Sequence, residues 1–308
     1  MLTFVGRRLA QAVLLVLGAL TIVFVVVRVV PGDPAKLMLG NQATDGQIAQ
    51  LRDQLGLSDP LWLQYVHYLA DIVRGDFGES WRIGGSALSV VAERLPATLI
   101  LASYAMVLTI AVGFPLGIYC ARRVGSWADH LVSSVSLVGQ ALPAFWVGIM
   151  LILLFTRTLN VLPSTADGTP QALLLPAITL ALPFLGWLAR LVRNGALEEM
   201  NRDYVRTAKS KGLSARVVFY VHVMRNTLVP VVTVLGLLMG NFIADAVIVE
   251  NVIAWPGIGS LMVESITNRD YSVVQATIAA ITVGYIVLNL VVDVLYFYLD
   301  PRIASENT

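Results

Sequence analysis

The chain has 308 residues, of which 57% are hydrophobic and only 13% are charged, and its mean hydropathy is +0.75. A soluble domain of this size carries more charge, so the composition indicates a polytopic membrane protein. The net charge of +1 gives no reason to expect nucleic-acid binding, and the single cysteine, Cys120, excludes an intrachain disulfide framework.

The first apolar run, Leu9 to Val30, follows Arg7 and Arg8 and resembles a signal peptide at first sight. It is long for a signal peptide and lacks a small-residue cleavage site. At 1.5 Å per residue it extends about 33 Å, enough to cross the hydrocarbon core. We therefore expect residues 1–30 to form a retained transmembrane helix.

Five further apolar runs follow, and each must be helical because lipid cannot satisfy backbone amides. They are Ala97 to Ala121, Leu131 to Phe155, Leu173 to Val192, Leu228 to Val249 and Val274 to Leu299. The predicted fold class is an all-α polytopic membrane protein with six transmembrane helices and both termini on one side. Gly113-x-x-x-Gly117 favours close helix packing, either within the chain or between subunits.

The distribution of Lys and Arg predicts on which side of the membrane the two termini lie. With the N-terminus in the cytoplasm, thirteen of the 21 basic residues lie in cytoplasmic segments. The positive-inside rule therefore predicts cytoplasmic termini, a cytoplasmic loop at 193–227 and a cytoplasmic tail at 300–308.

Residues 31–96 are too polar for a membrane span and predict an external, partly helical segment. Asp59-Pro60 is a favourable helix start, and apolar or aromatic residues then recur at helical spacing, namely Leu61, Tyr65, Tyr68, Leu69 and Ile72. The helix is interpreted as a cap packed on the protein's own core, and a contact surface for an external partner is compatible with that interpretation.

Several kinds of catalytic motif do not occur. The chain has no Gly-x-x-x-x-Gly-Lys-Ser/Thr phosphate loop, so we expect it to bind no ATP by itself, and no cluster with metal-ligand spacing. Intramembrane ionisable residues are few, namely Arg28, Asp245 and Asp293, which is sparse for an ion-coupled carrier.

A polar stretch, Glu198 to Asn226, interrupts the apolar sequence with three acids and six bases. It predicts a helix from Glu198 to Ser210, a left-handed residue at Gly212, and a second helix from Ala215 to about Met224 capped by Ser214. From these residues alone, docking onto a protein and lying on the anionic inner leaflet remain equally open.

The sequences DYVRTAKSKGLS and HVMRNTLVP resemble the cytoplasmic coupling loop of binding-protein-dependent ABC importer permeases, specifically the dipeptide/oligopeptide branch. Arg206 and Thr207 depart from the general Glu-Ala-Ala form and match the peptide branch. VVPGDP, GDFGESW, VENVIAWPGIGSLMVESITNRDY and NLVVDVLYFYLDPRI extend the resemblance over essentially the whole chain.

The resemblance implies a type I importer (MetI-like) permease fold whose core is residues 97–299. It implies half of a translocation pathway, paired with a second homologous permease. Two partner ATPase subunits would bind ATP and Mg, and an extracytoplasmic binding protein would deliver peptide in a bacterial plasma membrane. The ATPase-coupling residues it implies are Tyr204, Arg206, Thr207, Ala208, Lys209, Lys211, Gly212, Leu213 and Ser214.

The resemblance also implies that the last external loop contacts the binding protein. The residues concerned are Glu250, Trp255, Pro256, Gly257 and Gly259. Asp245, with Asn241, is a candidate for the substrate path, where an acid would meet a peptide's amino group; a carboxylate satisfied within the protein is the equal alternative. Asp293 is interpreted as half of a structural ion pair with a base such as Arg190.

Two alternatives to a peptide importer remain. The same class of importer carries other cargo, such as nickel, glutathione or another small solute, and an ion-coupled secondary carrier is the alternative from a different class. The polar stretch and the few intramembrane carboxylates favour the importer.

Overall fold

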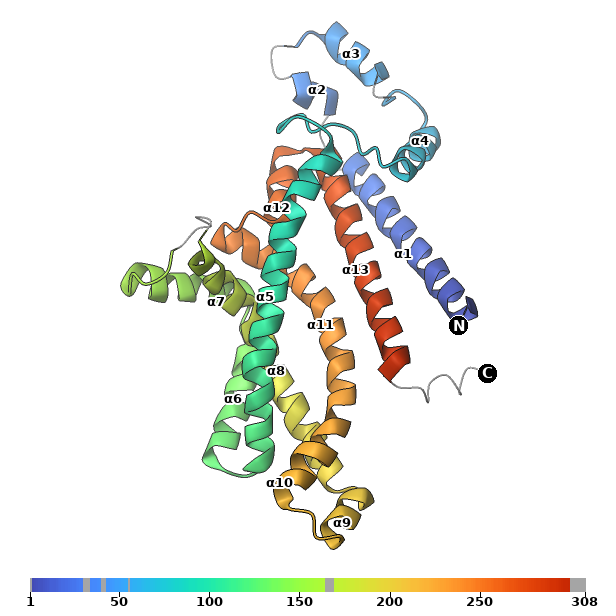
Figure 1. Cartoon of the computed structure of the whole chain (residues 1–308). Coiled ribbons are helices and arrows are strands. Elements are labelled where there is room, and N and C mark those ends of the chain that lie inside the picture. The colour runs from blue at the N-terminus through green and yellow to red at the C-terminus, as the bar shows by residue number, and fades with distance from the viewer. Residues whose placement is uncertain (1, 30–33, 40–42, 55, 164–168, 300–308) are drawn as a thin grey trace. The chain divides into compact units, whose positions relative to one another are not determined.

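The computed structural model describes residues 2–29, 34–39, 43–54, 56–163 and 169–299, and these are almost entirely helical (Figure 1). They divide into two compact units, which are described separately. One unit contains residues 1–96 and 257–286, and the other contains residues 97–256 and the chain from Val287 onward. The predicted tail, 300–308, lies outside the described residues.

The first unit holds the N-terminal helices, the start of α5 and two later helices. Its elements are α1 (Leu2–Val29), α2 (Pro34–Leu39), α3 (Asp45–Gln54), α4 (Leu61–Val73), the first residues of α5 (Ala87–Arg122), α12 (Ile258–Asn268) and the first half of α13 (Tyr271–Leu299). Its core joins α5 to α12 and α13 through Val91, Leu261 and Val273. Ser80 adds a buried hydrogen bond, 2.5 Å, to the Asp270 carboxylate that begins α13.

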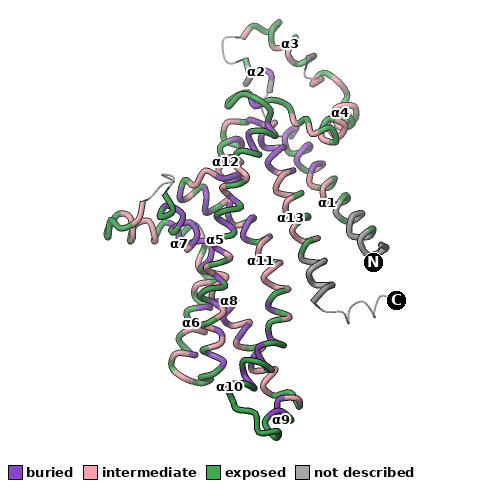
Figure 2. The backbone as a smooth tube through the Cα atoms, viewed as in Figure 1, coloured by how far each residue is buried: buried purple, intermediate pink, exposed green. Residues whose placement is uncertain are grey.

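The second unit is built around one buried helix, α8 (Leu174–Met200), which packs on α6 (Trp127–Ala141) and α11 (Met224–Ile253). Its other elements are α7 (Ala144–Leu151), the π-helix η1 (Ile152–Thr158), the 3-10 helix η2 (Pro170–Leu173), α9 (Asp203–Ser210), α10 (Ala215–Val217) and the π-helix η3 (Val218–Val223). Figure 2 shows buried residues concentrated along α8.

Glycines allow α5 to approach α8 closely. A β-carbon built at Gly113 would lie 2.8 Å from the carbonyl oxygen of Leu185, and one at Gly117 would lie 2.6 Å from that of Ala189. Real β-carbons essentially never come so close to backbone. The Gly113-x-x-x-Gly117 motif therefore packs within the chain, the first of its two interpretations.

Four helices in the described residues are long and apolar enough to cross a membrane, or five if one bent pair counts as a span. They match the second, fourth, fifth and sixth predicted runs, and a shorter apolar stretch, Val13–Val29, lies in the first. The structure is thus a multi-helix membrane fold.

The third predicted run, Leu131 to Phe155, is not one straight helix. It breaks at Leu142 and Pro143, where α6 and the helix that follows meet at 106°. Leu142 is extended, as expected for a residue before proline, and Pro143 supplies no amide hydrogen. Pro183 and Pro230, by contrast, lie inside continuous helices.

Candidate functional site

The polar stretch folds into a short helix between two long ones. Helix α8 ends at Met200, α9 occupies Asp203–Ser210, and a turn leads into α10. Gly212 is left-handed with φ +77°, and the Ser214 hydroxyl caps α10 by accepting from the Val217 amide, which confirms both predictions. In Figure 1, α9 and α10 lie at the lower end of α8 and α11.

The predicted helix from Glu198 to Ser210 is interrupted, however. Arg202 is extended (φ −72°, ψ 151°), and the Asn201 side chain donates back to the carbonyl of Leu197 at 3.1 Å. Asn201 thus closes α8 and Arg202 starts α9 in a new direction. The second helix was also predicted too short, because α10, η3 and α11 form one continuous run from Ala215 to Ile253.

The apolar face of α9 is buried within its own chain. Val205 and Ala208 are 1% and 7% exposed, and they belong to a core cluster with Val218, Phe219 and Val223. The polar stretch therefore does not need a partner to bury this face. Ala208, predicted as an ATPase-coupling residue, supports the segment from inside and has no free surface for a partner.

Tyr204 fixes the start of α9 to the end of α8. Its hydroxyl donates to a carboxylate oxygen of Glu199 at 2.5 Å, and its ring packs on the same core cluster. Burial raises the pKa of the Tyr204 phenol, and the hydrogen bond to Glu199 raises it further. The phenol therefore stays protonated at neutral pH and donates its hydrogen bond to Glu199, so Tyr204, like Ala208, positions α9.

The surface that α9 and α10 leave free is the run from Lys209 to Val217, in which every residue is exposed. We call it the coupling turn. It carries the bases Lys209, Lys211 and Arg216 and two large apolar side chains, Leu213 at its tip and Val217 at its end, which are 40% and 39% exposed. A β-carbon on Gly212 would meet no atom within 4 Å, so this glycine is uncovered in the part of the chain that the structure describes.

Two features border the coupling turn. A pocket of 270 Å³ opens beside it, lined by Lys209, Arg216, Tyr220 and neighbouring residues of α5, α8 and η3. Arg206 forms an ion pair with Asp203 at 3.6 Å, and both side chains are mostly exposed. Such a pair contributes little to the stability of the fold, so Arg206 can exchange Asp203 for an acid on a partner. Thr207 is exposed beside it, and its hydroxyl donates to the Asp203 carbonyl.

A buried ion pair fixes α6 to α8 two turns before α8 ends. The Arg193 guanidinium contacts both carboxylate oxygens of Asp129, at 2.5 and 2.7 Å, and Asp129 is 1% exposed. Asp129 also accepts from the Gly125 amide, and its own amide donates to Ser126, the N-cap of α6. The pair was not predicted from the sequence, although Ser126-x-x-Asp129 is a helix-start signal.

Asp129→Asn is expected to destabilise the protein by roughly 3 kcal/mol, because Arg193 would keep a buried charge without its partner. The measurement is the thermal unfolding of the purified membrane complex. Arg202→Gln is the control, since the Arg202–Glu198 pair is more than half exposed and contributes at most about 0.5 kcal/mol. Equal melting temperatures for Asp129→Asn and Arg202→Gln would contradict a structural role for the buried pair.

The predicted binding-protein loop is more deeply packed than expected. Glu250 is fully buried inside α11 and accepts a 2.5 Å hydrogen bond from Thr98, so it braces α11 and cannot contact a partner at the surface. Gly257 and Gly259 are also buried, which their lack of side chains permits. Trp255 and Pro256 remain half-buried, and the Trp255 indole donates to the carbonyl of Ala97 at 3.0 Å.

The candidate substrate-path residues lie one helical turn apart on α11. Asn241 is exposed and lines a pocket of 390 Å³ together with Gln140, Phe184, Trp187 and apolar residues of α8 and α11. Asp245 is half-buried and does not line that pocket. The side chain of Asp293 lies outside the described residues, so its pairing with Arg190 stays a prediction. No group of three metal-ligating side chains occurs among the described residues.

The structure is a helical membrane fold with an exposed basic turn at the end of two long helices. Residues 113–305 match the family described as binding-protein-dependent transport system inner membrane component, and residues 1–102 match the corresponding N-terminal family. The chain belongs to this family of importer permease subunits. It is thus a transport component without catalytic activity of its own.

The sequence similarity to known proteins extends over nearly the full length of the chain. The chain is 38% identical to the probable D,D-dipeptide transport system permease protein DdpB of Escherichia coli, covering 94% of both chains. It is 35% identical to the dipeptide transport system permease protein DppB of Alkalihalophilus pseudofirmus, covering 98% of this chain and 99% of that one. It is 37% identical to the di/tripeptide transport system permease protein DppB of Pseudomonas aeruginosa, covering 99% and 100%.

Two solved structures share the fold. An amino acid ABC transporter crystallised with histidines superimposes with a TM-score of 0.52 at 17% identity, over 68% of this chain and 93% of that one. The inward-facing MetNI methionine ABC transporter superimposes with a TM-score of 0.57 at 12% identity, over 68% and 96%. The fold is therefore that of a type I ABC importer permease, as predicted.

Proposed function

We propose that this chain forms half of the translocation pathway of an ATP-driven importer of dipeptides or oligopeptides. A second homologous permease forms the other half, two ATPase subunits hydrolyse ATP, and an extracytoplasmic binding protein delivers the peptide. The observation that carries the proposal is the coupling turn, a fully exposed basic surface held at the ends of α8 and α11 by a buried core. The peptide names of the full-length relatives support the cargo class.

The coupling turn fits a mechanical role. Its base is rigid, because Val205 and Ala208 pack on the chain's own core and Tyr204 bonds to the end of α8. Its outer edge offers bases and one apolar tip, a combination that suits an acidic cleft on an ATPase subunit. When the ATPases close, force applied to this edge passes directly into α8 and α11. The positive-inside rule supports cytoplasmic termini, an orientation in which the turn faces the ATPase side of the bacterial plasma membrane.

Reconstitution of the complete complex in lipid vesicles tests the proposal. Uptake of a labelled dipeptide should require ATP, the binding protein and both permeases, and it should persist when ion gradients are dissipated. Uptake by this chain without ATPase subunits, driven by an ion gradient, would overturn the proposal in favour of a secondary carrier. ATP-driven uptake of nickel or glutathione, with no uptake of peptides, would keep the importer and change its cargo.

We expect Trp255→Ala to reduce the stimulation of ATP hydrolysis by the binding protein. The half-buried indole both holds the end of α11 to Ala97 and presents apolar surface beside Pro256. Trp255→Phe separates these roles, because it keeps apolar area and loses the hydrogen bond. Stimulation retained in Trp255→Phe and lost in Trp255→Ala identifies a contact role, whereas equal stimulation in all three proteins would contradict any role in binding-protein docking.

A further inference from the structure

Helix α4 has three different faces. Tyr65 and Tyr68 contact α1, and Gln64, His67 and Asp71 form a polar face. The third face is apolar and consists of Trp62, Val66, Leu69 and Val73, spaced as one helical stripe. Three of these four side chains are strongly exposed, at 69% for Trp62, 52% for Val66 and 87% for Val73, and no residue of α4 is fully buried.

Aromatic packing and hydrogen bonds attach α4 to the C-terminal half of α1. The ring of Phe24 lies 5.1 Å from that of Tyr65 and 5.3 Å from that of Tyr68. The hydroxyls of Thr21 and Tyr65 are 2.6 Å apart, and the Arg28 guanidinium donates to Gln64 at 3.1 Å. Figure 1 shows α4 at this end of α1, its axis turned well away from that of α1.

These contacts fix the position of α4 along the axis of α1, and hence its depth relative to the apolar stretch of α1. Phe24, at their centre, is five residues from Val29, the end of the apolar stretch, which corresponds to about 7 Å along the helix axis. An amphipathic helix at a membrane surface buries its apolar face about 5–10 Å into the boundary between headgroups and acyl chains. The level of α4 therefore lies inside the hydrophobic length of α1 and matches that of an interfacial helix.

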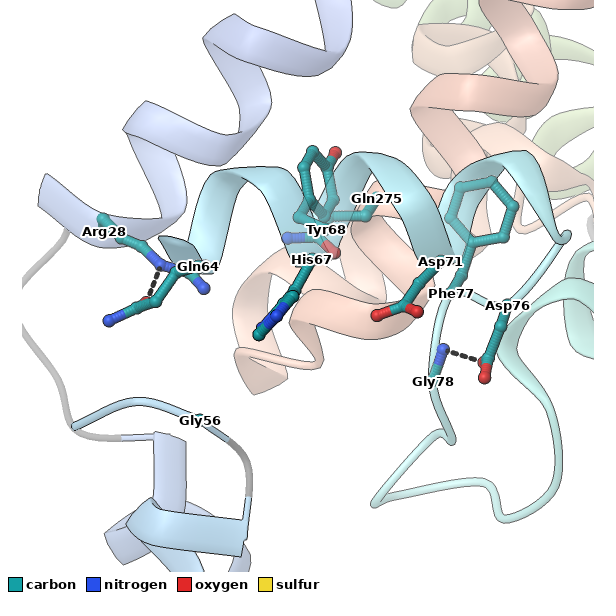
Figure 3. A pocket seen from close by; sticks show the side chains of 10 residues that line it. All are labelled: Arg28, Gly56, Gln64, His67, Tyr68, Asp71, Asp76, Phe77, Gly78 and Gln275. Carbon is teal, nitrogen blue, oxygen red and sulfur yellow. Dashed lines mark hydrogen bonds between the residues drawn. The ribbon is translucent and has the colours of Figure 1, made fainter. Parts of the chain in front are cut away.

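The direction of each face agrees with this level. Gln64, from the polar face, contacts Arg28 at the end of α1, whereas Tyr65, toward the apolar stripe, contacts Thr21, about 10 Å deeper. The apolar stripe thus points toward the membrane centre. Figure 3 shows the polar side, where Gln64, His67 and Asp71 project together into a pocket of 240 Å³.

We propose that α4 lies in the plane of the membrane, with Trp62, Val66, Leu69 and Val73 inserted among the acyl chains of the outer leaflet. On α1, Ile22, Val25 and Val29 are likewise exposed apolar side chains, at 65%, 49% and 74%. Trp62 is of the residue type enriched at membrane interfaces. The polar pocket then opens to the external water. The inference rests on the chain's place in a membrane family and, for the outer leaflet, on the proposed cytoplasmic termini; it does not depend on the cargo.

Spin labels test the proposal in the complete complex reconstituted in vesicles. Single cysteines replace Val66 and Val73 on the stripe and His67 and Asp71 on the polar face, in a Cys120→Ala background because Cys120 is the chain's one native cysteine. Power saturation then compares access of lipid-soluble oxygen with access of a water-soluble nickel chelate. The measurement is repeated with the binding protein present.

We expect labels at 66 and 73 to favour oxygen over nickel, and labels at 67 and 71 on the same helix to show the reverse order. Nickel access at 66 and 73 as high as at 67 and 71 would place α4 in water and overturn the proposal. Low access of both reagents at 66 and 73 would also overturn the proposal, because it would show that a protein covers the stripe. That protein is the binding protein if the low access appears only when it is added, and otherwise the second permease. Transport is not measured, so failure here is separate from failure of the proposed function.

Discussion

Gly212→Val is expected to abolish most ATP-driven transport by the assembled complex while the membrane helices of this chain still insert. Gly212 has φ +77°, and a β-branched residue there costs roughly 1–2 kcal/mol, enough to drive the backbone out of the left-handed region. Among the described residues no atom lies within 4 Å of a β-carbon at this position, so the added side chain meets no steric clash and the cost is backbone strain alone. The expected effect is a change in the backbone direction of the coupling turn, which would misalign the surface that docks on the ATPase.

Gly212→Asn is the matched control for this substitution. Asparagine is close to valine in size but enters the left-handed region far more readily, so it should preserve the turn and most of the transport. The measurements are co-purification of ATPase subunits with the permease, and transport in vesicles. Binding of the ATPase subunits to the permease should also weaken at high salt, because salt screens the exposed charges of Lys209, Lys211 and Arg216.

Full stoichiometry and full transport in Gly212→Val would contradict the coupling role, and would favour a turn that lies on the membrane surface. Equal loss in the valine and asparagine variants would mean that the added volume matters and the backbone conformation does not. Ala208→Glu is unsuitable for this test, because Ala208 lies in the chain's own core and an acid there would disrupt α9 directly.

Gly117→Ala is expected to destabilise the permease through the contact of α5 with α8. The new methyl would lie 2.6 Å from the carbonyl oxygen of Ala189 and 2.7 Å from the β-carbon of Val192, and neither can move without separating the two helices. Overpacking of this kind typically costs about 1–3 kcal/mol. The expected result is a lower melting temperature of the purified complex and less folded protein in the membrane.

Gly18→Ala, in the middle of α1, is the control for Gly117→Ala. A β-carbon at Gly18 meets nothing within 4 Å, so only the helix preference of alanine over glycine acts, by up to about 1 kcal/mol in favour of the variant. The two substitutions are chemically identical and should shift the melting temperature in opposite directions. A rise for both would show that α5 and α8 are less closely packed than described.

The helical membrane class, the left-handed Gly212 and the Ser214 cap followed from the sequence, because each depends on composition or on residues close together in the chain. The bend at Pro143 did not, since Pro183 and Pro230 lie in similarly apolar runs and remain helical. What differs is the packing around each proline, which a single sequence does not display.

The candidate site was predicted unevenly for the same reason. The sequence indicated an apolar face on α9 but not which residues bury that face. Phe219 and Val223 pack against α9 only because the chain reverses direction after α9. The buried states of Glu250 and Asp129 depend on Thr98 and Arg193, which are 152 and 64 residues away. A polar residue in an apolar chain has a structural or a functional role. Only the tertiary structure shows whether its side chain is buried against another helix or is free to contact a partner protein.

The π-helix η3 separates the direction of the coupling turn from the exact number of residues before α11. Because η3 continues directly into α11, its wide turn holds a residue that an ordinary α-helix would not need. Deleting one residue between Val218 and Val223 would let the run close as α-helix and leave Ala215, with α9 before it, near its present angle around the axis. The same deletion within the ordinary α-helix of α11 would rotate Ala215 by about 100°. A relative that lacks one residue in η3 would therefore still present the bases of its turn in the same direction.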